Sequence, residues 1–374
     1  MCEGRLECEA ISEESRILSR EDSKRCSTWN IDRTSLERVV KEGILFCNEC
    51  QTWYPITNYV PVMLDFPIHL HKTFYETNKK TFDSLGSFKI PSNSPRWGEK
   101  YVQLSFSRQW GDLGFQDIKF DYKIETLRNY HSVELDWPEW VLNSPGKKLL
   151  DVGIGLGQES MILQEITNDE IFGIDLNLSL INSGSVFSNK PFIHPIVASL
   201  FQLPFPKSYF DIVFSNGVLH HTFSTKKAFH SILEYMDDQG MIYIWLYARE
   251  TKFTSLRHHL RDFLEIYVAP IIARFPKLMQ DIIVYPIAIK RFLTFKKHSR
   301  LSDYEYSFKN ALHEERDTWT PRFAHVQSII EVIEWFQEKG LEYRLLDTLK
   351  FKEVVGSSMR NLGIRGIKKS NYKD

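Results

Sequence analysis

From Lys147 onward the chain alternates between short apolar runs and segments whose apolar residues recur at helical spacing. Apolar runs of this length predict buried strands, and the periodic segments between them predict helices. Such alternation is typical of βαβ units and a parallel sheet. The expected strands are 148–154, 170–176, 192–199, 210–218 and 240–248, with helices at 157–166, 179–188 and 225–236.

Mostly helical, aromatic sequence interrupts this alternation at about 250–315. Residues 325–340 then have apolar residues at helical spacing and end in Gly340, a C-terminal stop signal for a helix. Two candidate strands, 341–349 and 359–369, follow with no helical pattern between them. We therefore predict an α/β domain over 146–374 with a helical insertion after its fifth strand.

Two regions precede this domain. Residues 1–66 carry all five cysteines and end in a short β-like run that contains two prolines. Residues 67–145 are expected to be irregular and to form an N-terminal extension or cap, with a loop at 89–100 and a helix and turn at 136–148.

Composition excludes several classes of protein. The 374 residues are 43% hydrophobic and carry a net charge of −1, so we expect no general attraction to nucleic acid. No stretch reaches the roughly 18 consecutive apolar residues of a membrane span, and the first ten residues lack an apolar signal core. Five unevenly spaced cysteines do not make a disulfide framework, which indicates the reducing cytoplasm.

Three alternating glycines, Gly153, Gly155 and Gly157, follow the first predicted strand directly. Glycine lets the backbone turn sharply and approach a ligand with no Cβ in the way. In open α/β sheets, ligands bind at the carboxyl ends of the strands, where this loop is expected. Asp175 ends the next strand, near the offset at which a carboxylate takes the ribose hydroxyls of an adenosine ligand, although such a residue is often only a helix cap.

The spacing separates two nucleotide-binding patterns. A dinucleotide fingerprint is Gly-x-Gly-x-x-Gly, whereas this chain has Asp151-x-Gly153-x-Gly155-x-Gly157. This pattern resembles the first motif of the class I S-adenosylmethionine-dependent methyltransferases. Further motifs resemble that family in order along the chain: Leu203-Pro204-Phe205, Phe210-Asp211 and the fifth-strand segment 236–247.

The resemblance implies a Rossmann-like, seven-stranded methyltransferase sheet whose last strand is antiparallel, in keeping with the paired strands of the tail. It also implies S-adenosyl-L-methionine as the cofactor. Asp151 and the three glycines would surround its amino-acid part, and Asp175 would bind the ribose. The other positions carried over are Leu176, Ser199 and Leu200 beside the adenine, and Asn216 and Gly217 at the methionine end.

Two positions depart from the family pattern. Ser199 stands where the family commonly has an acidic residue, so an adenine contact here would be a hydrogen bond without charge. The usual Pro-Gly-Gly turn before the fifth strand is replaced by Asp238-Gln239-Gly240, which we interpret as a tolerated change in that turn.

Histidines supply the candidate catalytic groups. Methyl transfer from a sulfonium is an SN2 displacement, and some oxygen and nitrogen nucleophiles also need a base, a question that the sequence leaves open. His220 and His221 follow the fourth strand and suit that role at neutral pH, but they can equally orient the loop. His325 is a third candidate. It belongs to the segment 317–328, in which Trp319, Arg322 and His325 either contact substrate or form an ordered loop before the last helix.

Residues 255–300 combine apolar helical faces with basic ends. Three interpretations compete for this segment: a lid over the substrate, a homodimer surface, and a helix pair lying on a membrane surface. We favour a lid or an oligomer patch, because prolines at 270, 276 and 286 are expected to break the segment into short helices. Phe106–Gly111 resembles a segment that precedes the core in these enzymes and is expected to cover the cofactor.

The N-terminal cysteines resemble part of a small zinc ribbon. Cys47-x-x-Cys50 looks like its second knuckle, and Cys2 before Gly4-Arg5-Leu6 looks like the end of its first. The leading cysteine of that knuckle would lie upstream of Met1, which leaves three ligands where structural zinc takes four. A metal-free remnant of the ribbon and a redox-active Cys-x-x-Cys are the alternatives to a bound zinc.

The leading hypothesis is therefore a methyltransferase that acts on a small organic molecule, as in small-molecule biosynthesis. One rival is a non-catalytic methyltransferase-like partner or scaffold, supported by Ser199 and the incomplete ribbon. A nicotinamide enzyme is another. The sequence leaves open the methyl acceptor and the oligomeric state.

Overall fold

The computed structural model describes residues 4–114, 128–129, 131–132, 135–247, 264–299, 306–346 and 361–368. The chain divides into two compact units. Unit 1 consists of Met1–Arg96, Glu139–Val213 and Ser231–Asp237, and unit 2 of Trp97–Pro138, Phe214–His230 and Asp238–Asp374. None of the described helices is long and apolar enough to cross a membrane.

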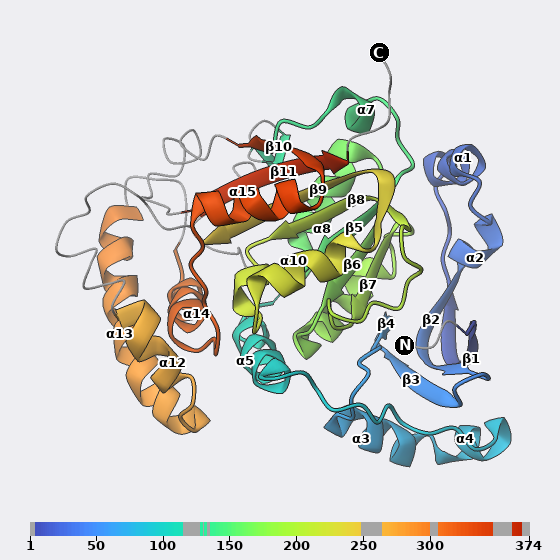
Figure 1. Ribbon diagram of the computed structural model, residues 1–374. Helices are drawn as coiled ribbons and strands as arrows, with labels where there is room; N and C mark the ends of the chain where they lie inside the picture. The colour runs from blue at the N-terminus through green and yellow to red at the C-terminus, as the bar shows by residue number, and fades with distance from the viewer. Residues whose placement is uncertain are drawn as a thin grey trace. The chain divides into compact units, whose positions relative to one another are not determined.

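Seven strands form one sheet in the order β10-β11-β9-β8-β5-β6-β7 (Figure 1). Strands β5, β6 and β7 pair in parallel, whereas β11 is antiparallel to both β9 and β10. This confirms the predicted Rossmann-like methyltransferase sheet with its antiparallel last strand. The strands are β5 (Lys148–Val152), β6 (Glu170–Asp175), β7 (Ile193–Val197), β8 (Phe210–Asn216), β9 (Met236–Tyr247), β10 (Leu341–Leu345) and β11 (Asn361–Lys368).

Two sequence predictions about local structure are wrong. The turn expected at Asp238–Gly240 is extended backbone inside β9, where the exposed Asp238 pairs with Lys368 of β11. Residues 67–145 are not mainly irregular, because they contain α3 (His69–Thr77), α4 (Lys79–Leu85), α5 (Glu99–Gly111) and α7 (Glu139–Leu142). The apolar positions of α3 and α4 are few, and long-range packing stabilises these helices.

In unit 1, α8 (Gln158–Thr167), η2 (Leu178–Ser183) and α9 (Gly184–Phe187) connect the parallel strands. Their core is apolar and fully enclosed, with Leu149, Leu150, Ile162 and Ile171 all at 1% exposure or less. The predicted strand–helix alternation is thus present, and it places the carboxyl ends of β5 and β6 at one edge of the sheet.

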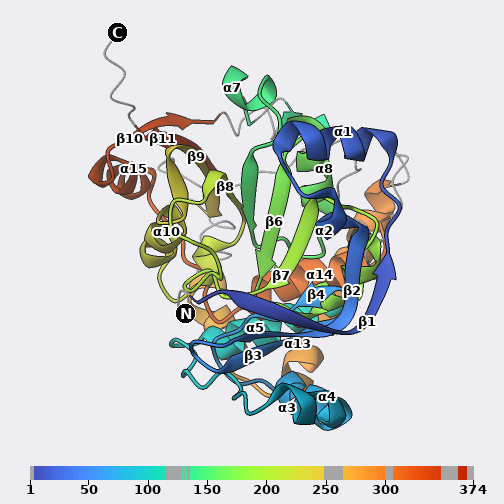
Figure 2. The same ribbon diagram turned by 90° about the vertical axis from the view of Figure 1, so that its right-hand side faces the viewer.

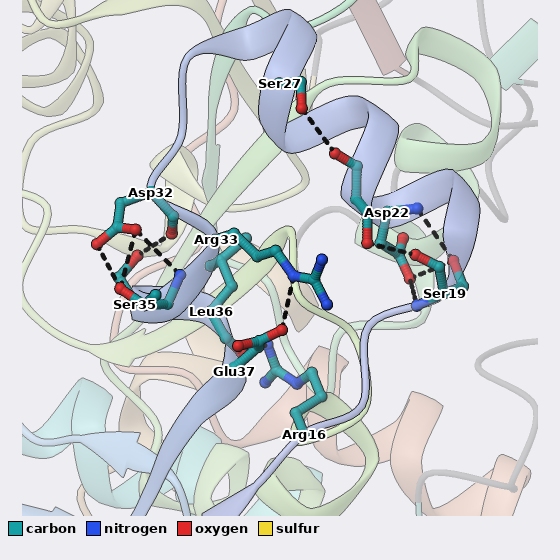
Figure 3. A network of polar contacts seen from close by, with 11 residues as sticks. Arg16, Ser19, Asp22, Ser27, Asp32, Arg33, Ser35, Leu36 and Glu37 are labelled. Carbon is teal, nitrogen blue, oxygen red and sulfur yellow. Dashed lines mark hydrogen bonds and ion pairs between the residues drawn. The ribbon is translucent and has the colours of Figure 1, made fainter.

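The N-terminal part of unit 1 is a four-stranded antiparallel sheet of β1 (Leu6–Ser15), β2 (Arg38–Cys47), β3 (Thr52–Thr57) and β4 (Val60–Pro61). Between β1 and β2 the chain forms α1 (Arg20–Trp29) and α2 (Arg33–Glu37), which lie at one end of these strands (Figure 2). Side chains cap both helices: the Asp22 amide donates to Ser19 Oγ at 3.0 Å, and the Thr34 amide donates to Asp32 Oδ1 at 3.0 Å (Figure 3).

This N-terminal sheet is attached to the free side of β7. Val62 pairs in parallel with Val197, and the Met63 amide donates to the Val197 carbonyl at 2.7 Å. The Asn58 amide side chain donates to the Ile181 carbonyl at 2.6 Å, and Arg16 Nε to the Ser188 carbonyl at 2.5 Å. Backbone groups at the edge of the sheet therefore have partners within the chain, as edge strands require.

Unit 2 contains α5, α12 (Ala269–Ile272), α13 (Lys277–Ser299), α14 (Phe308–Trp319) and α15 (Ile329–Glu338), with the π-helical turn η4 (Leu264–Val268) before α12. Helix α10 (Thr225–Leu233), which the sequence predicts, also begins in this unit. Figure 1 shows α12 and α13 next to α14. The prediction that prolines break this segment into short helices is wrong at Pro286, which lies inside the 23-residue α13. Apolar contacts with α14 offset the backbone bond that proline removes.

Candidate active site

The glycine loop of unit 1 joins β5 to α8. Gly153, Gly155 and Gly157 have φ values of 88°, 62° and 94°, a region that residues with a Cβ rarely adopt. A Cβ on Gly157 would lie 2.1 Å from Cζ of Phe187, so this position also lacks the space for a side chain. The loop thus requires glycine for the reason that its sequence suggested.

Asp175 closes this loop from the end of β6. Its Oδ2 accepts the Gly155 amide at 2.8 Å, and its Oδ1 accepts the Asn177 amide at 2.8 Å. The side chain is half-buried, so the carboxylate is anchored to the loop without being enclosed. Asn177 is fully buried. The sequence did not predict its contact with Asp175, although Asn177 lies only two residues further along the chain.

Asp151 has a different position from Asp175. It is 3% exposed and accepts a hydrogen bond from Ser160 Oγ of α8 at 2.5 Å. Its carboxylate therefore fixes the start of the loop to the following helix. Such a buried acceptor holds the loop in shape.

Ser199 begins a short turn after β7. The side chain is 2% exposed, and its Oγ accepts the Phe201 amide at 3.2 Å. The Leu200 carbonyl accepts Ser231 Oγ at 2.9 Å, and Leu176 is half-buried directly after Asp175. The adenine contacts predicted for these three residues remain predictions.

The residues of unit 1 fit an adenosine-containing cofactor. The loop presents backbone without Cβ atoms, and beside it lies a partly exposed carboxylate that can accept hydrogen bonds from paired hydroxyls. Both features lie at the carboxyl ends of parallel strands, as the class of ligand requires.

In unit 2 the end of β8 leads through Asn216 and Gly217 to the short helix η3 (Leu219–His221). Gly217 has a φ of 78° and donates its amide to the Trp245 carbonyl at 3.1 Å. Asn216 is half-buried. This geometry fixes the direction of the two histidines that follow.

His220 and His221 have different surroundings. His220 is fully buried, and its ring stacks on Tyr247 with centroids 3.9 Å apart. Neither of its ring nitrogens has a hydrogen-bond partner in the described part of the chain. Burial holds the pKa of His220 well below its ordinary value, with the nearby His221 and His325 acting in the same direction.

His221 has one defined partner. Its Nδ1 lies 2.8 Å from the Phe323 carbonyl, which can only accept, so Nδ1 carries the proton and Nε2 is the free base. Burial lowers the pKa of His221, while Asp317 and the Phe323 carbonyl oppose that shift. His221 is therefore a neutral imidazole with a basic Nε2 at neutral pH.

A polar chain lies behind these rings within unit 2. The Tyr247 hydroxyl donates to Asp317 Oδ2 at 3.1 Å, and Gln109 Nε2 donates to Asp317 Oδ1 at 2.9 Å. Gln109 belongs to the predicted segment Phe106–Gly111, which forms part of α5, and Phe106 packs edge-on against His221. Tyr247 and Asp317 were missed, although Tyr247 ends a central strand, the position from which site residues usually come.

The segment 317–328 contains the three residues predicted to contact substrate, and only part of this set lies near His220 and His221. His325 donates its amide to the His220 carbonyl at 2.9 Å, so all three candidate histidines lie close together. The Arg322 guanidinium lies 4.3 Å from the Tyr101 ring centroid. Trp319 instead packs with the α13–α14 core and donates to Glu315 Oε2 at 2.9 Å.

The cysteines of unit 1 do not support a zinc site. Cys47 is buried, and Gly4 packs so closely on it that a Cβ there would lie 2.6 Å from Sγ. Cys8 and Cys26 are free thiols. No group of three metal-ligating side chains occurs among the residues that the structure describes, and Cys2 lies outside them.

Comparison with known proteins identifies the domain. Residues 150–244 match a family described as a methyltransferase domain. Together with the sheet order and the glycine loop, this shows that the chain carries a class I S-adenosylmethionine-dependent methyltransferase domain.

Individual relatives are distant. The chain is 26% identical to phosphoethanolamine N-methyltransferase 3 of Arabidopsis thaliana over 30% of its own length and 23% of that protein. It is 25% identical to the ubiquinone/menaquinone biosynthesis C-methyltransferase UbiE of Vibrio campbellii over 28% of its length and 43% of that protein. A structure of Haemonchus contortus phosphoethanolamine N-methyltransferase 2 with S-adenosyl-L-methionine aligns at 13% identity and a TM-score of 0.44, over 99% of this chain and 70% of that one. The chain spans less than half the length of these curated relatives.

Proposed function

We propose that this protein transfers a methyl group from S-adenosyl-L-methionine to a small organic molecule. The observation that carries the proposal is the position of the Asp175 carboxylate. It lies at the end of β6 and accepts the Gly155 amide of the loop after β5, whose glycines have positive φ. Such an arrangement suits the ribose of the cofactor, and the family match over residues 150–244 to a methyltransferase domain supports the same activity. When bound, the cofactor supplies an electrophilic methyl group on a sulfonium.

For this cofactor we propose roles that follow the geometry of unit 1. Asp175 accepts hydrogen bonds from the ribose hydroxyls, and the backbone without Cβ atoms at Gly153 and Gly155 lies along the amino-acid part. Asp151 keeps the loop in position through Ser160. The roles predicted for Asn216 and Gly217 stay predictions.

We propose His221 as the group that takes a proton from the acceptor. Its basic Nε2 and lowered pKa suit a general base at neutral pH. His220 is enclosed and stacked on Tyr247, which suits a positioning role. The named relatives are described as N- and C-methyltransferases, so nitrogen, carbon and oxygen acceptors all belong in an acceptor screen.

Calorimetric titration of the full chain with S-adenosyl-L-methionine tests the proposal. We expect binding, and we expect Asp175→Ala to weaken it at least about tenfold, or roughly 1.4 kcal/mol, because charge-assisted bonds to the ribose are lost. Glu234→Ala is the matched control, since Glu234 is an exposed carboxylate of the same unit that pairs with Lys207 at the surface.

Absence of binding at millimolar cofactor would favour the non-catalytic partner, which Ser199 and the cysteine arrangement support. Preference for a nicotinamide dinucleotide in the same titration would favour the dehydrogenase alternative. We propose a cytoplasmic location, because the five unevenly spaced cysteines do not make a disulfide framework.

A further inference from the structure

Helix α13 has large apolar side chains outside the face that packs on α14. Its inner face packs on α14, where Val284 and Ala288 are fully buried against Ala311 and Leu312. A helix of a globular protein normally has one such face and presents polar residues on the other. The apolar side chains outside the packed face of α13 therefore need an explanation.

We define the outer face of α12–α13 by its large, exposed apolar side chains. On α13, Leu278, Ile282, Ile289 and Leu293 recur at helical spacing and are 72%, 65%, 48% and 61% exposed. The outer face also includes Met279 of α13, Ile271 of α12 and Tyr267 just before it. Exposed apolar patches of this kind mark contact with another molecule or a membrane.

The outer face is continuous along the helix. Because α13 runs through Pro286 without a break, the apolar side chains before and after the proline belong to one helix. The proline-based reason for favouring a lid or oligomer patch therefore does not apply within α13, although Pro276 still separates α13 from α12.

Charge is distributed unevenly around the outer face. Between residues 264 and 300 the sequence has two acidic residues, Glu265 and Asp281, and Asp281 pairs with Arg108 and Arg316 of neighbouring helices. The same stretch has seven arginines and lysines, of which Arg291 pairs with Glu314 and Glu315 of α14. Arg274, Lys277 and Lys290 are exposed, and the others are Lys296, Lys297 and Arg300.

We propose that the outer face of α12–α13 docks on an anionic lipid bilayer, with α13 lying in the plane of the interface. Exposed apolar side chains enter the headgroup–acyl boundary, and the surrounding lysines and arginines attract the anionic headgroups. A second copy of this chain fits less well, because a two-fold contact would bring two basic rims together. The proposal does not depend on methyl transfer.

The test is co-sedimentation of the full-length protein with vesicles of phosphatidylcholine, alone or mixed with phosphatidylglycerol. We expect binding to the mixed vesicles that weakens at high salt, and little binding to phosphatidylcholine alone. The double variant Ile282→Glu/Leu293→Glu removes apolar contact, and Lys277→Glu/Lys290→Glu reverses charge. Each is expected to reduce binding at least about tenfold.

Ile330→Glu is the matched control, since Ile330 is 70% exposed on α15, away from the outer face in sequence and element. It should bind vesicles like the unaltered protein. Circular dichroism melting establishes that each variant is folded. Failure of the folded, unaltered protein to bind mixed vesicles overturns the proposal. So does a dimer, measured by light scattering, that Ile282→Glu/Leu293→Glu converts to a monomer.

Discussion

Two adjacent histidines in unit 2 illustrate how surroundings separate residues that the sequence treats alike. His220 is enclosed against Tyr247, whereas His221 has a proton on Nδ1 fixed by the Phe323 carbonyl. A base must present an unprotonated nitrogen at the working pH. Only His221 has a defined tautomer that provides one.

We predict that the His221 ring remains neutral, with its proton on Nδ1, down to a pH below the ordinary histidine pKa of about 6.5. The physical reason is burial, which disfavours the imidazolium. Two-bond ¹H–¹⁵N correlation spectra over a pH series give both tautomer and charge, and His221→Gln assigns the signal. His69→Gln assigns an exposed histidine for reference. A proton on Nε2, or protonation of His221 above pH 6.5, contradicts the prediction.

At the scale of elements, the N-terminal sheet and the methyltransferase sheet meet along β7 in unit 1. Gly184 begins α9 at this junction, and a Cβ there would lie 1.7 Å from the Asn58 carbonyl oxygen. That oxygen belongs to the backbone and cannot rotate away. The contact between the two sheets therefore depends on one missing side-chain atom.

We predict that Gly184→Ala lowers the free energy of unfolding by about 2–4 kcal/mol. Alanine is normally favoured over glycine in a helix by about 1 kcal/mol, so the sign of the change tests the steric contact. Urea denaturation measures it, with the exposed Ser185→Ala on the same helix as the control. Stabilisation by Gly184→Ala would show that α9 and Asn58 are not in contact.

At the scale of the whole molecule, pH dependence of unfolding near neutrality is set by buried groups. The net charge of −1 leaves little general repulsion between charges. Burial raises the pKa of Asp169 from 3.8 to about 7 and lowers the pKa of His71 from 6.5 to about 4. Ionisation of buried Asp169 therefore lowers the free energy of unfolding as pH rises from about 4 to 7. Protonation of His71 lowers it as pH falls from about 6.5 to 4, because the unfolded chain binds that proton more readily.

We predict that Asp169→Asn stabilises the protein at pH 8 and has little effect near pH 4. The raised pKa of Asp169 limits the gain in the free energy of unfolding at pH 8 to about 4 kcal/mol. The asparagine oxygen can still accept the Lys147 amide, as Asp169 does at 2.9 Å. Urea midpoints at the two pH values measure the difference. The exposed Asp83→Asn is the control. An equal effect of Asp169→Asn at both pH values would show that its carboxyl titrates normally.

The sequence by itself determined the strand–helix alternation, the antiparallel tail and the glycine loop with Asp175. These follow from local periodicity and from backbone conformations that glycine alone adopts readily, so neighbouring residues suffice to predict them. Roles assigned only through the family resemblance, such as that of Ser199, stay predictions.

Only the tertiary structure decided the tautomer of His221, the bond between Tyr247 and Asp317, the junction at Gly184 and the continuity of α13 through Pro286. Each depends on a partner far away in the sequence, such as Phe323 for His221 or α14 for α13. Local patterns do not contain these partners, because burial and packing arise only when distant segments come together.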